Sequence, residues 1–577
     1  MLNTARQDEA FACLAVRPCG ATFTQAEAAW LAAAKQQNAR LVLLRSAKET
    51  DEAAAEAYAG QIVGMTFRIL PDEEDQAPLQ TFLAAEAIPR GRCVLLKAGR
   101  ASFLQANRTL RSIASACRAR LRRLLYGHQK TVEAERLSRV QPGEREALRR
   151  ECAAFPQGHP RLLIVSQIAA FDKGSCAFLK RLLDEIPEWN VLHISETPRL
   201  THKTLQEKLS TPFHRAAWAA FPNGFPAKLS GCVPADRRSG LSLAVKEASE
   251  NLVQRFPSLG SEGALALSLY LEDLFTQALE LFKPDRLLVW NAFTAAHTIV
   301  CALAKERGLP ICYMEFGLLP GTMGLDMVGQ MGASQLANES RLEMDDAACA
   351  KAEAVIAYLA ERSMNRNDQQ AARAGSRVFL PAAGGKKVVT VIGQNDYESG
   401  ICPWNDTARR EHSPWFPTSS AALKAVADAC EGMEVTVVYR PHPAMTTDKL
   451  ELPKGVLLAA GGDLFSLLAQ SDLVVTLMSQ VSYEALLHGH NVLMLGRCQL
   501  SGKGCCYELR QGEDLKESLQ KALENGLTQE MRAAFRHHVA RVLTTCAYDD
   551  MQPRPLRYGR ETGGWRELLA PCTGDRD

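Results

Sequence analysis

Two carboxylates and two amides stand within one short segment, Gly-Gln-Asn-Asp-Tyr-Glu, which begins at Gly393. The apolar run 388–392 precedes it and predicts a strand, so the polar side chains follow a strand end. A carboxylate there, either Asp396 or Glu398, could attack an anomeric carbon or act as a base. The alternative is an Asx turn that caps the next helix, a frequent role of Asn and Asp.

A histidine bracketed by prolines forms the second segment, which reads Arg-Pro-His-Pro from Arg440 to Pro443. It follows the predicted strand 435–439, and each proline fixes the backbone and removes a donor N–H. The ring of His442 and the guanidinium of Arg440 should therefore be held rigidly, and both suit a phosphate or a carboxylate. A lone histidine is more often structural, but prolines at a strand end favour a binding role.

The third segment places two hydroxyl side chains, Thr476 and Ser479, between the predicted strand 472–477 and the predicted helix 479–488. Ser479 is a suitable N-cap, and the free N–H groups and dipole of a helix start attract an anion. The same helix carries Glu484. Capping without a ligand is the alternative, but two hydroxyls at a strand-to-helix change favour a nucleotide phosphate.

A fourth segment lies earlier in the chain, where the predicted strand 310–315 ends on Glu315 and a Gly- and Pro-rich turn leads to Asp326. Burying a carboxylate without a partner is costly, so Glu315 must have a partner or a ligand. A carboxylate that faces a cleft from a second domain suits a general acid or base acting on an acceptor hydroxyl.

These segments need parallel strands to position them, and the chain supplies two sets. Strand–helix–strand units are predicted over 162–195 and 264–315. Later strands are predicted at 388–392, 435–439, 472–477 and 492–495, with helices between them. The alternation predicts an α/β protein with two Rossmann-like doubly wound domains, whose ligands bind at the carboxyl ends of the strands.

Four parts are predicted along the chain. Residues 1–157 form an N-terminal α/β block without a recognised motif, and 158–345 form the first Rossmann-like domain. Residues 346–385 are a helical linker, and 386–577 form the second Rossmann-like domain with C-terminal helices.

The N-terminal block has predicted strands at 41–44 and 93–96 and a long predicted helix over 101–129. Six arginines lie in that helix: Arg108, Arg111, Arg118, Arg120, Arg122 and Arg123. They could contact a membrane surface or a phosphorylated partner, and the alternative is a solvated helix face.

The bulk composition excludes several classes of protein. Lys and Arg total 67 against 65 Asp and Glu, so the net charge of +2 leaves no global basic footprint for nucleic acid. No apolar run approaches the ~20 residues of a membrane span, and the first residues lack the pattern of a secretion signal. The 17 cysteines are scattered without a C-x-x-C pair, which argues against disulfides and structural zinc. We expect a cytoplasmic protein.

Together, these segments resemble the bacterial capsule polysaccharide synthesis proteins that include the β-Kdo transferases, where Kdo is 3-deoxy-manno-octulosonic acid. The resemblance covers about residues 159–504 and depends on the order and spacing of five stretches. They are Val289-Trp290-Asn291; Glu315 to Gly317 with Leu319-Pro320 and Asp326 to Gly329; Val391 to Asp396; Tyr439 to Pro443; and Thr476-x-x-Ser479 with Glu484 to Leu487 and Gly489.

The resemblance implies a GT-B fold with an interdomain cleft and a retaining transfer from CMP-Kdo, a substrate, with no cofactor and no metal. It implies that Asp396 is the covalent nucleophile, although family loops place this carboxylate four residues after the glutamine, where Glu398 stands here. His442 and Ser479 would hold CMP, and Glu315 would be the acid or base. Gln394, Arg440, Pro443, Thr476 and Glu484 are assigned to donor binding, and Asn291 and Asp326 to acceptor binding or structure.

Two alternatives stay open. The stretch from Gln499 to Gly504 replaces an aromatic stretch of the family, which leaves a CMP-sialic acid as a second candidate donor. A non-catalytic capsule assembly or export factor is the other alternative, and the carboxylates and the Arg-Pro-His-Pro segment argue against it. The expected partners are a CMP-activated sugar, a glycan or glycolipid acceptor and capsule assembly proteins, but not nucleic acid.

Because no spanning segment is predicted, any attachment to the inner membrane would have to be peripheral, and the arginines of 101–129 are its most obvious contact. Each basic group near an anionic leaflet contributes about 1 kcal/mol, and salt screens exposed charges over ~8 Å. Replacing Arg118, Arg120, Arg122 and Arg123 with Gln should abolish co-sedimentation with anionic vesicles at low salt. Binding that survives the replacement, or no binding by the wild type, would show that this helix is not the membrane contact.

Overall fold

A computed structural model describes the chain over 12–17, 40–45, 66–67, 93–97, 132–166, 183–195, 213–217, 229–340, 343–362, 385–443, 445, 451–459, 463–550 and 555–561. The chain divides into two compact units, Met1–Lys130 and Thr131–Asp577. The predicted boundary at 157 is therefore too late. Helix α6 (Pro142–Ala153) buries Leu148 and Cys152 in the core of the second unit, which is why it belongs there.

The first unit contains a four-stranded parallel sheet in the order β3-β2-β1-β4. Its strands are β1 (Ala12–Arg17), β2 (Arg40–Arg45), β3 (Thr66–Phe67) and β4 (Cys93–Lys97). The strands predicted at 41–44 and 93–96 are thus confirmed. The arginine-rich stretch 101–129 lies outside the described residues.

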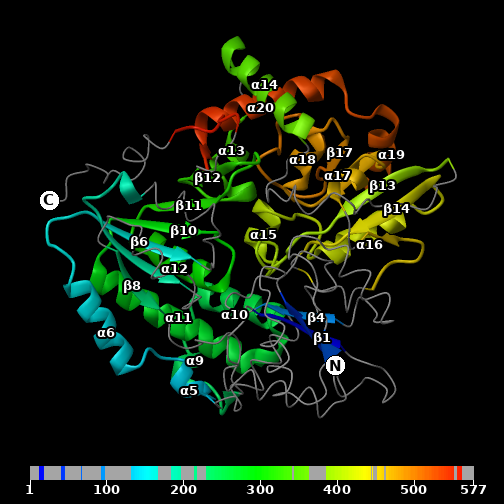
Figure 1. Cartoon of the computed structure of the whole chain (residues 1–577). Coiled ribbons are helices and arrows are strands. Elements are labelled where there is room, and N and C mark those ends of the chain that lie inside the picture. Colours follow the sequence, from blue (N-terminus) through cyan, green and yellow to red (C-terminus); the bar gives the residue numbers. More distant parts are fainter. Residues whose placement is uncertain are drawn as a thin grey trace. The chain divides into compact units, whose positions relative to one another are not determined.

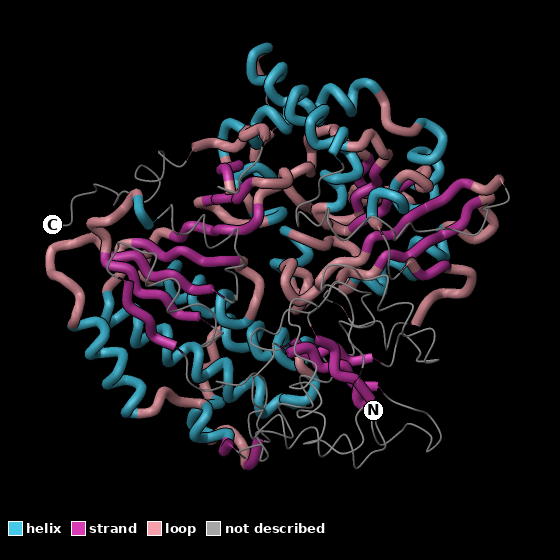
Figure 2. Tube along the Cα trace, in the orientation of Figure 1, coloured by secondary structure: helices cyan, strands magenta, loops and turns pink. Residues whose placement is uncertain are grey.

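The second unit holds two large sheets, each accompanied by helices (Figures 1 and 2), and a short parallel pair of β5 (Val132–Glu133) with β9 (Leu229–Ser230). The first sheet has the order β19-β12-β11-β10-β6-β7-β8. Its strands are β6 (Arg161–Ser166), β7 (Asn190–Ser195), β8 (Phe213–Ala217), β10 (Arg286–Trp290), β11 (Ile311–Phe316), β12 (Thr322–Asp326) and β19 (Ala547–Asp549). The five strands from β11 to β8 run parallel, and β12 and β19 each pair antiparallel with their neighbours.

Helix α11 (Gly260–Phe282) forms the centre of the helical layer of this domain. It is apolar around most of its circumference, as expected of a buried helix, and it ends where Lys283 takes a left-handed conformation. The neighbouring elements are β5 (Val132–Glu133), α5 (Ala134–Leu137), β9 (Leu229–Ser230), α9 (Ala235–Arg238), α10 (Leu243–Arg255) and α12 (Ala295–Glu306). Helix α11 packs against α10, α12 and α6.

The second sheet is entirely parallel, in the order β15-β14-β13-β16-β17-β18. Its strands are β13 (Lys387–Ile392), β14 (Val435–Arg440), β15 (Leu457–Leu458), β16 (Leu473–Thr476), β17 (Val492–Met494) and β18 (Tyr507–Glu508). Its helices are α15 (Asp406–Glu411), α16 (Ser419–Ala429), α17 (Leu464–Leu468), α18 (Val481–Leu487) and α19 (Leu515–Asn525). The predicted fold class, two Rossmann-like α/β domains, is confirmed.

The chain returns to the first sheet at its C-terminal end. Helix α20 (Gln529–Thr545) packs along α14 (Asp346–Arg362) and leads directly into β19, which pairs with β12. The residues predicted as 386–577 therefore do not all belong to the second domain. The apolar Tyr548 side chain explains the return, because it is fully buried in the core under the first sheet.

Removing this buried ring should destabilise the second unit. We expect Tyr548→Ala to lower the free energy of unfolding by about 3–5 kcal/mol, because it leaves a cavity that the core can fill only in part. Tyr548→Phe removes the hydroxyl that accepts a bond from Arg560 Nη1 (2.9 Å) and should cost about 1 kcal/mol. Urea unfolding measures both, with the half-buried Tyr507→Ala as a control. Equal losses in Tyr548→Ala and Tyr507→Ala would contradict this account of β19.

Candidate functional site

The carboxyl ends of three neighbouring strands place the predicted segments side by side. Ile392 of β13 lies level with Arg440 of β14 and with Thr476 of β16. The loops that follow these strands carry Gln394, His442 and Ser479, so the expectation that they share one edge of the sheet is met. This edge is where ligands bind in open parallel sheets.

Gly393 is required where the first two loops meet. Its N–H donates to the carbonyl oxygen of Arg440 (2.8 Å). A Cβ on Gly393 would lie 2.5 Å from the hydroxyl of Tyr439 and 3.1 Å from the backbone nitrogen of His442. A larger residue would therefore push the His442 loop away from the edge.

Asp396 is buried and both of its carboxylate oxygens are bound by one residue. The backbone N–H of Ser419, the first residue of α16, donates to the two oxygens at 3.2 and 3.0 Å, and its hydroxyl also donates. Burial raises the pKa of Asp396, and the bonds from Ser419 oppose that rise. The carboxylate thus joins the β13 loop to the start of α16, whose N-cap is Thr418, rather than capping the next helix along the chain, α15.

Glu398 is more accessible and is held differently. Its side chain is 29% exposed, and Arg255 of α10 pairs with its Oε1. Asn395 Nδ2 donates to Oε2 at 2.8 Å. Glu398 therefore has a fixed carboxylate that solvent can still reach, and its partner comes from the first domain.

Gln394 carries a buried acceptor that has no partner among the described residues, its Oε1. Its backbone N–H donates to Ser419 Oγ at 3.0 Å, so the residue is held at the backbone. An unsatisfied buried amide oxygen is costly, and it is therefore a candidate acceptor for a ligand donor.

The Thr476–Ser479 segment differs from its prediction in one respect. Helix α18 begins at Val481, and the N-cap position falls on Gln480, whose side chain makes no capping bond, rather than on Ser479. The Ser479 hydroxyl still accepts from the N–H of Val481 (3.3 Å), and Thr476 Oγ1 accepts from the N–H of Ser479 (3.0 Å). Glu484 is buried within the same helix.

Arg440 does not present its whole guanidinium at the edge as predicted. It is 7% exposed, and its Nη1 donates to the carbonyl oxygen of Ala459 (3.0 Å), beyond β15. Arg440 is the last residue of β14, and this bond ties the strand end to the segment after β15. His442 is half-buried and Pro443 is exposed.

Asn291 brings the first domain to this edge. It has a positive φ of 65°, unusual for a residue other than glycine, and it is buried. Its Nδ2 donates to the carbonyl oxygen of Glu398 at 2.9 Å, and its Oδ1 accepts from the N–H of Phe293 at 2.8 Å. The strained residue thus connects the end of β10 to the loop that carries the carboxylates.

The two carboxylates of the fourth segment have different surroundings. Asp326 accepts three backbone N–H groups, from Val328 (2.7 Å), Gly329 (3.0 Å) and Gln335 (2.8 Å). Burial is the main influence on its pKa and raises it. Asp326 therefore fixes a turn, in agreement with the structural option, whereas Glu315 stands half-buried near the end of β11.

Three residues of this region were not found from the sequence: Asn251, Arg255 and His412. Asn251 Nδ2 donates to the carbonyl oxygens of Tyr397 (3.1 Å) and Cys402 (3.0 Å). The spacing of Asn251 and Arg255, four apart on one helix face, was the available signal.

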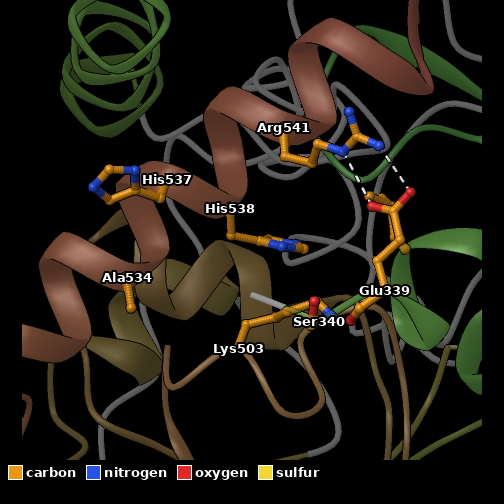
Figure 3. A pocket seen from close by; sticks show the side chains of 8 residues that line it. Glu339, Ser340, Lys503, Ala534, His537, His538 and Arg541 are labelled. Atoms are coloured by element: carbon orange, nitrogen blue, oxygen red, sulfur yellow. Dashed lines mark hydrogen bonds and ion pairs between the residues drawn. The ribbon is translucent and has the colours of Figure 1, made fainter. Parts of the chain in front are cut away.

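A small cavity lies apart from this edge, among Leu336, Glu339, Ser340, Lys503, Ala534, His537, His538 and Arg541 (Figure 3). Arg541 donates to both carboxylate oxygens of Glu339, at 2.8 and 3.0 Å, and Lys503 donates to the Glu339 carbonyl. Figure 3 shows the Glu339–Arg541 pair at one side of the cavity. These contacts hold α20 beside the segment that follows α13 (Gln335–Asn338).

Two features, a membrane-spanning helix and a metal-binding cluster, are absent from the part of the chain that the structure describes. No helix there is both long enough and apolar enough to span a membrane. No group of three or more His, Cys, Asp or Glu side chains there is arranged to hold a metal ion.

His412 generates a pH prediction. Burial lowers its pKa from 6.5 to about 4, Arg497 adds to the effect and Glu411 opposes it. Between pH 6.5 and about pH 4, the His412 ring is protonated in the unfolded chain but not in the folded chain. The free energy of unfolding therefore falls as the pH falls. His412 should contribute about 1.4 kcal/mol of this loss per pH unit. Urea unfolding measures the free energy of unfolding of wild type and of His412→Gln from pH 7 to 4.5. The difference between the two proteins should become smaller as the pH falls, and a constant difference would contradict the prediction.

Comparison with known proteins identifies one region of the chain. The family model described as capsule polysaccharide biosynthesis protein matches residues 437–542. Among curated proteins, none matches the chain. The matched region contains the Arg-Pro-His-Pro segment and the Thr476–Ser479 segment.

Several solved structures are similar over larger parts of the chain. KpsC of Thermosulfurimonas dismutans, described as a beta Kdo 2,7 transferase, is 19% identical, with 53% of this chain and 89% of that chain covered and a TM-score of 0.31. Its beta Kdo 2,4 transferase is 17% identical, with 44% and 79% covered and a TM-score of 0.32. CalG4, the calicheamicin glycosyltransferase, is 12% identical, with 71% and 96% covered and a TM-score of 0.28. These low TM-scores carry no argument about activity. Over residues 437–542 the chain is thus similar to the capsule polysaccharide biosynthesis family, the family that the sequence segments resemble.

Proposed function

We propose that this protein is a glycosyltransferase that moves an acidic ulosonic sugar, Kdo in the first instance, from CMP to a capsule or surface glycan. One observation carries the proposal. Three parallel strands bring Gln394, His442 and Ser479 to one edge, and two of these residues lie in the region that matches the capsule family.

The donor would lie along this edge of the second sheet. His442 and the Ser479 hydroxyl would bind the CMP phosphate. Ser479 is held in place because its backbone N–H donates to Thr476 Oγ1. The buried Oε1 of Gln394 would accept a hydrogen bond from a hydroxyl of the sugar, which would remove the cost of leaving it unsatisfied. Arg440 would act on the donor only indirectly, by holding the end of β14.

The nucleophile of a retaining transfer would be Glu398 rather than Asp396. Asp396 is only 6% exposed, and Ser419 holds its carboxylate against the start of α16, so an anomeric carbon could not approach it without displacing that helix. The Glu398 carboxylate is oriented and reachable. It would form a bond to the anomeric carbon as CMP departs with the bonding electrons, and the acceptor oxygen would then displace it. Glu315 would take the proton of the acceptor hydroxyl.

The substitutions Glu398→Gln, Asp396→Asn and Glu315→Gln separate these roles. Glu398→Gln should lower kcat by at least about 10³-fold because an amide cannot form the intermediate. Glu315→Gln should lower kcat by about 10²- to 10⁴-fold. Asp396→Asn should keep most of kcat and lose about 1–3 kcal/mol of stability, because it weakens a buried hydrogen-bond acceptor. The measurements are CMP release with acceptor present and urea unfolding.

Wild-type protein is first incubated with CMP-Kdo and, separately, with a CMP-sialic acid. Turnover of CMP-Kdo alone supports the proposal. Turnover of only the CMP-sialic acid would show that the donor is a CMP-sialic acid and not CMP-Kdo. Saturable CMP binding without turnover of either would favour the non-catalytic alternative. Full activity in Glu398→Gln would exclude the proposed nucleophile.

A further inference from the structure

We propose that Arg255 of α10 is a positioning residue that aims the Glu398 carboxylate, so that the first domain completes the reactive group of the second. This inference rests on the proposed function. It concerns a helix that carries none of the predicted segments, and it assigns a role to an ion pair between two domains.

Helix α10 presents a polar face to the loop that follows β13. The face consists of Glu247, Asn251, Gln254 and Arg255, whose spacing places them on one side of a helix. Asn251 donates to two carbonyl oxygens of the loop, and Glu247 Oε1 accepts from Asn405 Nδ2 (2.5 Å). Gln254 Oε1 accepts from the thiol of Cys402. One helix face is thus matched to the loop over residues 397–405.

Most of these contacts fix the loop, but the contact of Arg255 is of another kind. Asn251 binds backbone carbonyls, so it sets where the loop lies whatever its side chains are. Arg255 binds the carboxylate of Glu398, and the two side chains are only 24% and 29% exposed. The guanidinium therefore determines where one carboxylate oxygen points, which backbone anchoring does not do.

Three other contacts leave Glu398 little freedom. Asn395 Nδ2 holds Oε2, and Asn291 Nδ2 holds the carbonyl oxygen. Its N–H donates to the carbonyl oxygen of Asn395 (3.1 Å). The carboxylate and the backbone on either side of it are thus restrained from both domains, and Arg255 supplies a charged partner from the first domain. A reactive group held this way starts close to its attacking geometry.

The test compares Arg255→Gln and Arg255→Lys with wild type. Arg255→Gln should lower kcat on the order of 10²-fold while the donor KM changes by less than about threefold. The Glu398 carboxylate would no longer be oriented toward the anomeric carbon, whereas the residues that bind the donor would be unchanged. Arg255→Lys should recover part of kcat, and added guanidinium should recover part of the activity of Arg255→Gln. The matched control is Arg238→Gln, which removes the pairing of Arg238 with Glu262 in the same domain and should leave kcat unchanged.

Hydrogen exchange of the peptide over 397–405 supplies a readout that needs no turnover. Arg255→Gln should exchange faster there than wild type, and Arg238→Gln should not. Unchanged exchange, or a wild-type kcat in Arg255→Gln, overturns the positioning role. A loss of kcat that neither lysine nor guanidinium relieves also overturns it, because the defect would then be structural. If wild type releases no CMP from any donor, the proposed function fails, and the exchange result alone decides whether Arg255 orders the loop.

Discussion

The parallel alignment of β13 with β14 and β16 is the constraint on which the rest of the candidate site depends. Buried β-branched side chains line these strands, and a shift of one residue would turn every side chain of a strand to the opposite face. Because Ile392 is level with Arg440 and Thr476, three loops leave the sheet together. The loop after β13 then has to fit between its neighbours and α10, which fixes Glu398 and buries Asp396.

Much of the fold was predictable because its strands are short apolar runs bounded by Gly, Pro or polar residues. The runs 388–392 and 435–439 became β13 and β14 almost residue for residue. The return of the chain was not predictable. Strand β19 has three residues, Ala-Tyr-Asp, and too short a pattern to reveal which of two sheets it would join. Likewise α6 could be recognised as a helix but not assigned to a domain, because its partners are distant in sequence.

The site was predictable as a location but not as a set of roles. A carboxylate after a strand can accept backbone N–H groups or face a ligand, and its sequence neighbours are the same in both cases. The role of Asp396 depends on Ser419, 23 residues later in the chain, which donates to its carboxylate. The role of Asp326 depends on a turn whose N–H groups fold back onto it. Arg255 and Asn251 resemble ordinary polar positions of a helix until the second domain is placed against them.

The return of the chain through β19 also determines the order in which the protein can be completed on the ribosome. Strand β12 would be an open edge of its sheet until β19 is made, and the whole second domain lies between them. At about 5–20 residues per second, the nascent chain would wait on the order of tens of seconds for that strand. During this time an exposed edge can pair with a strand of another chain. The earlier domain can therefore close only after the later one has emerged, so its exposure to aggregation depends on the speed of translation.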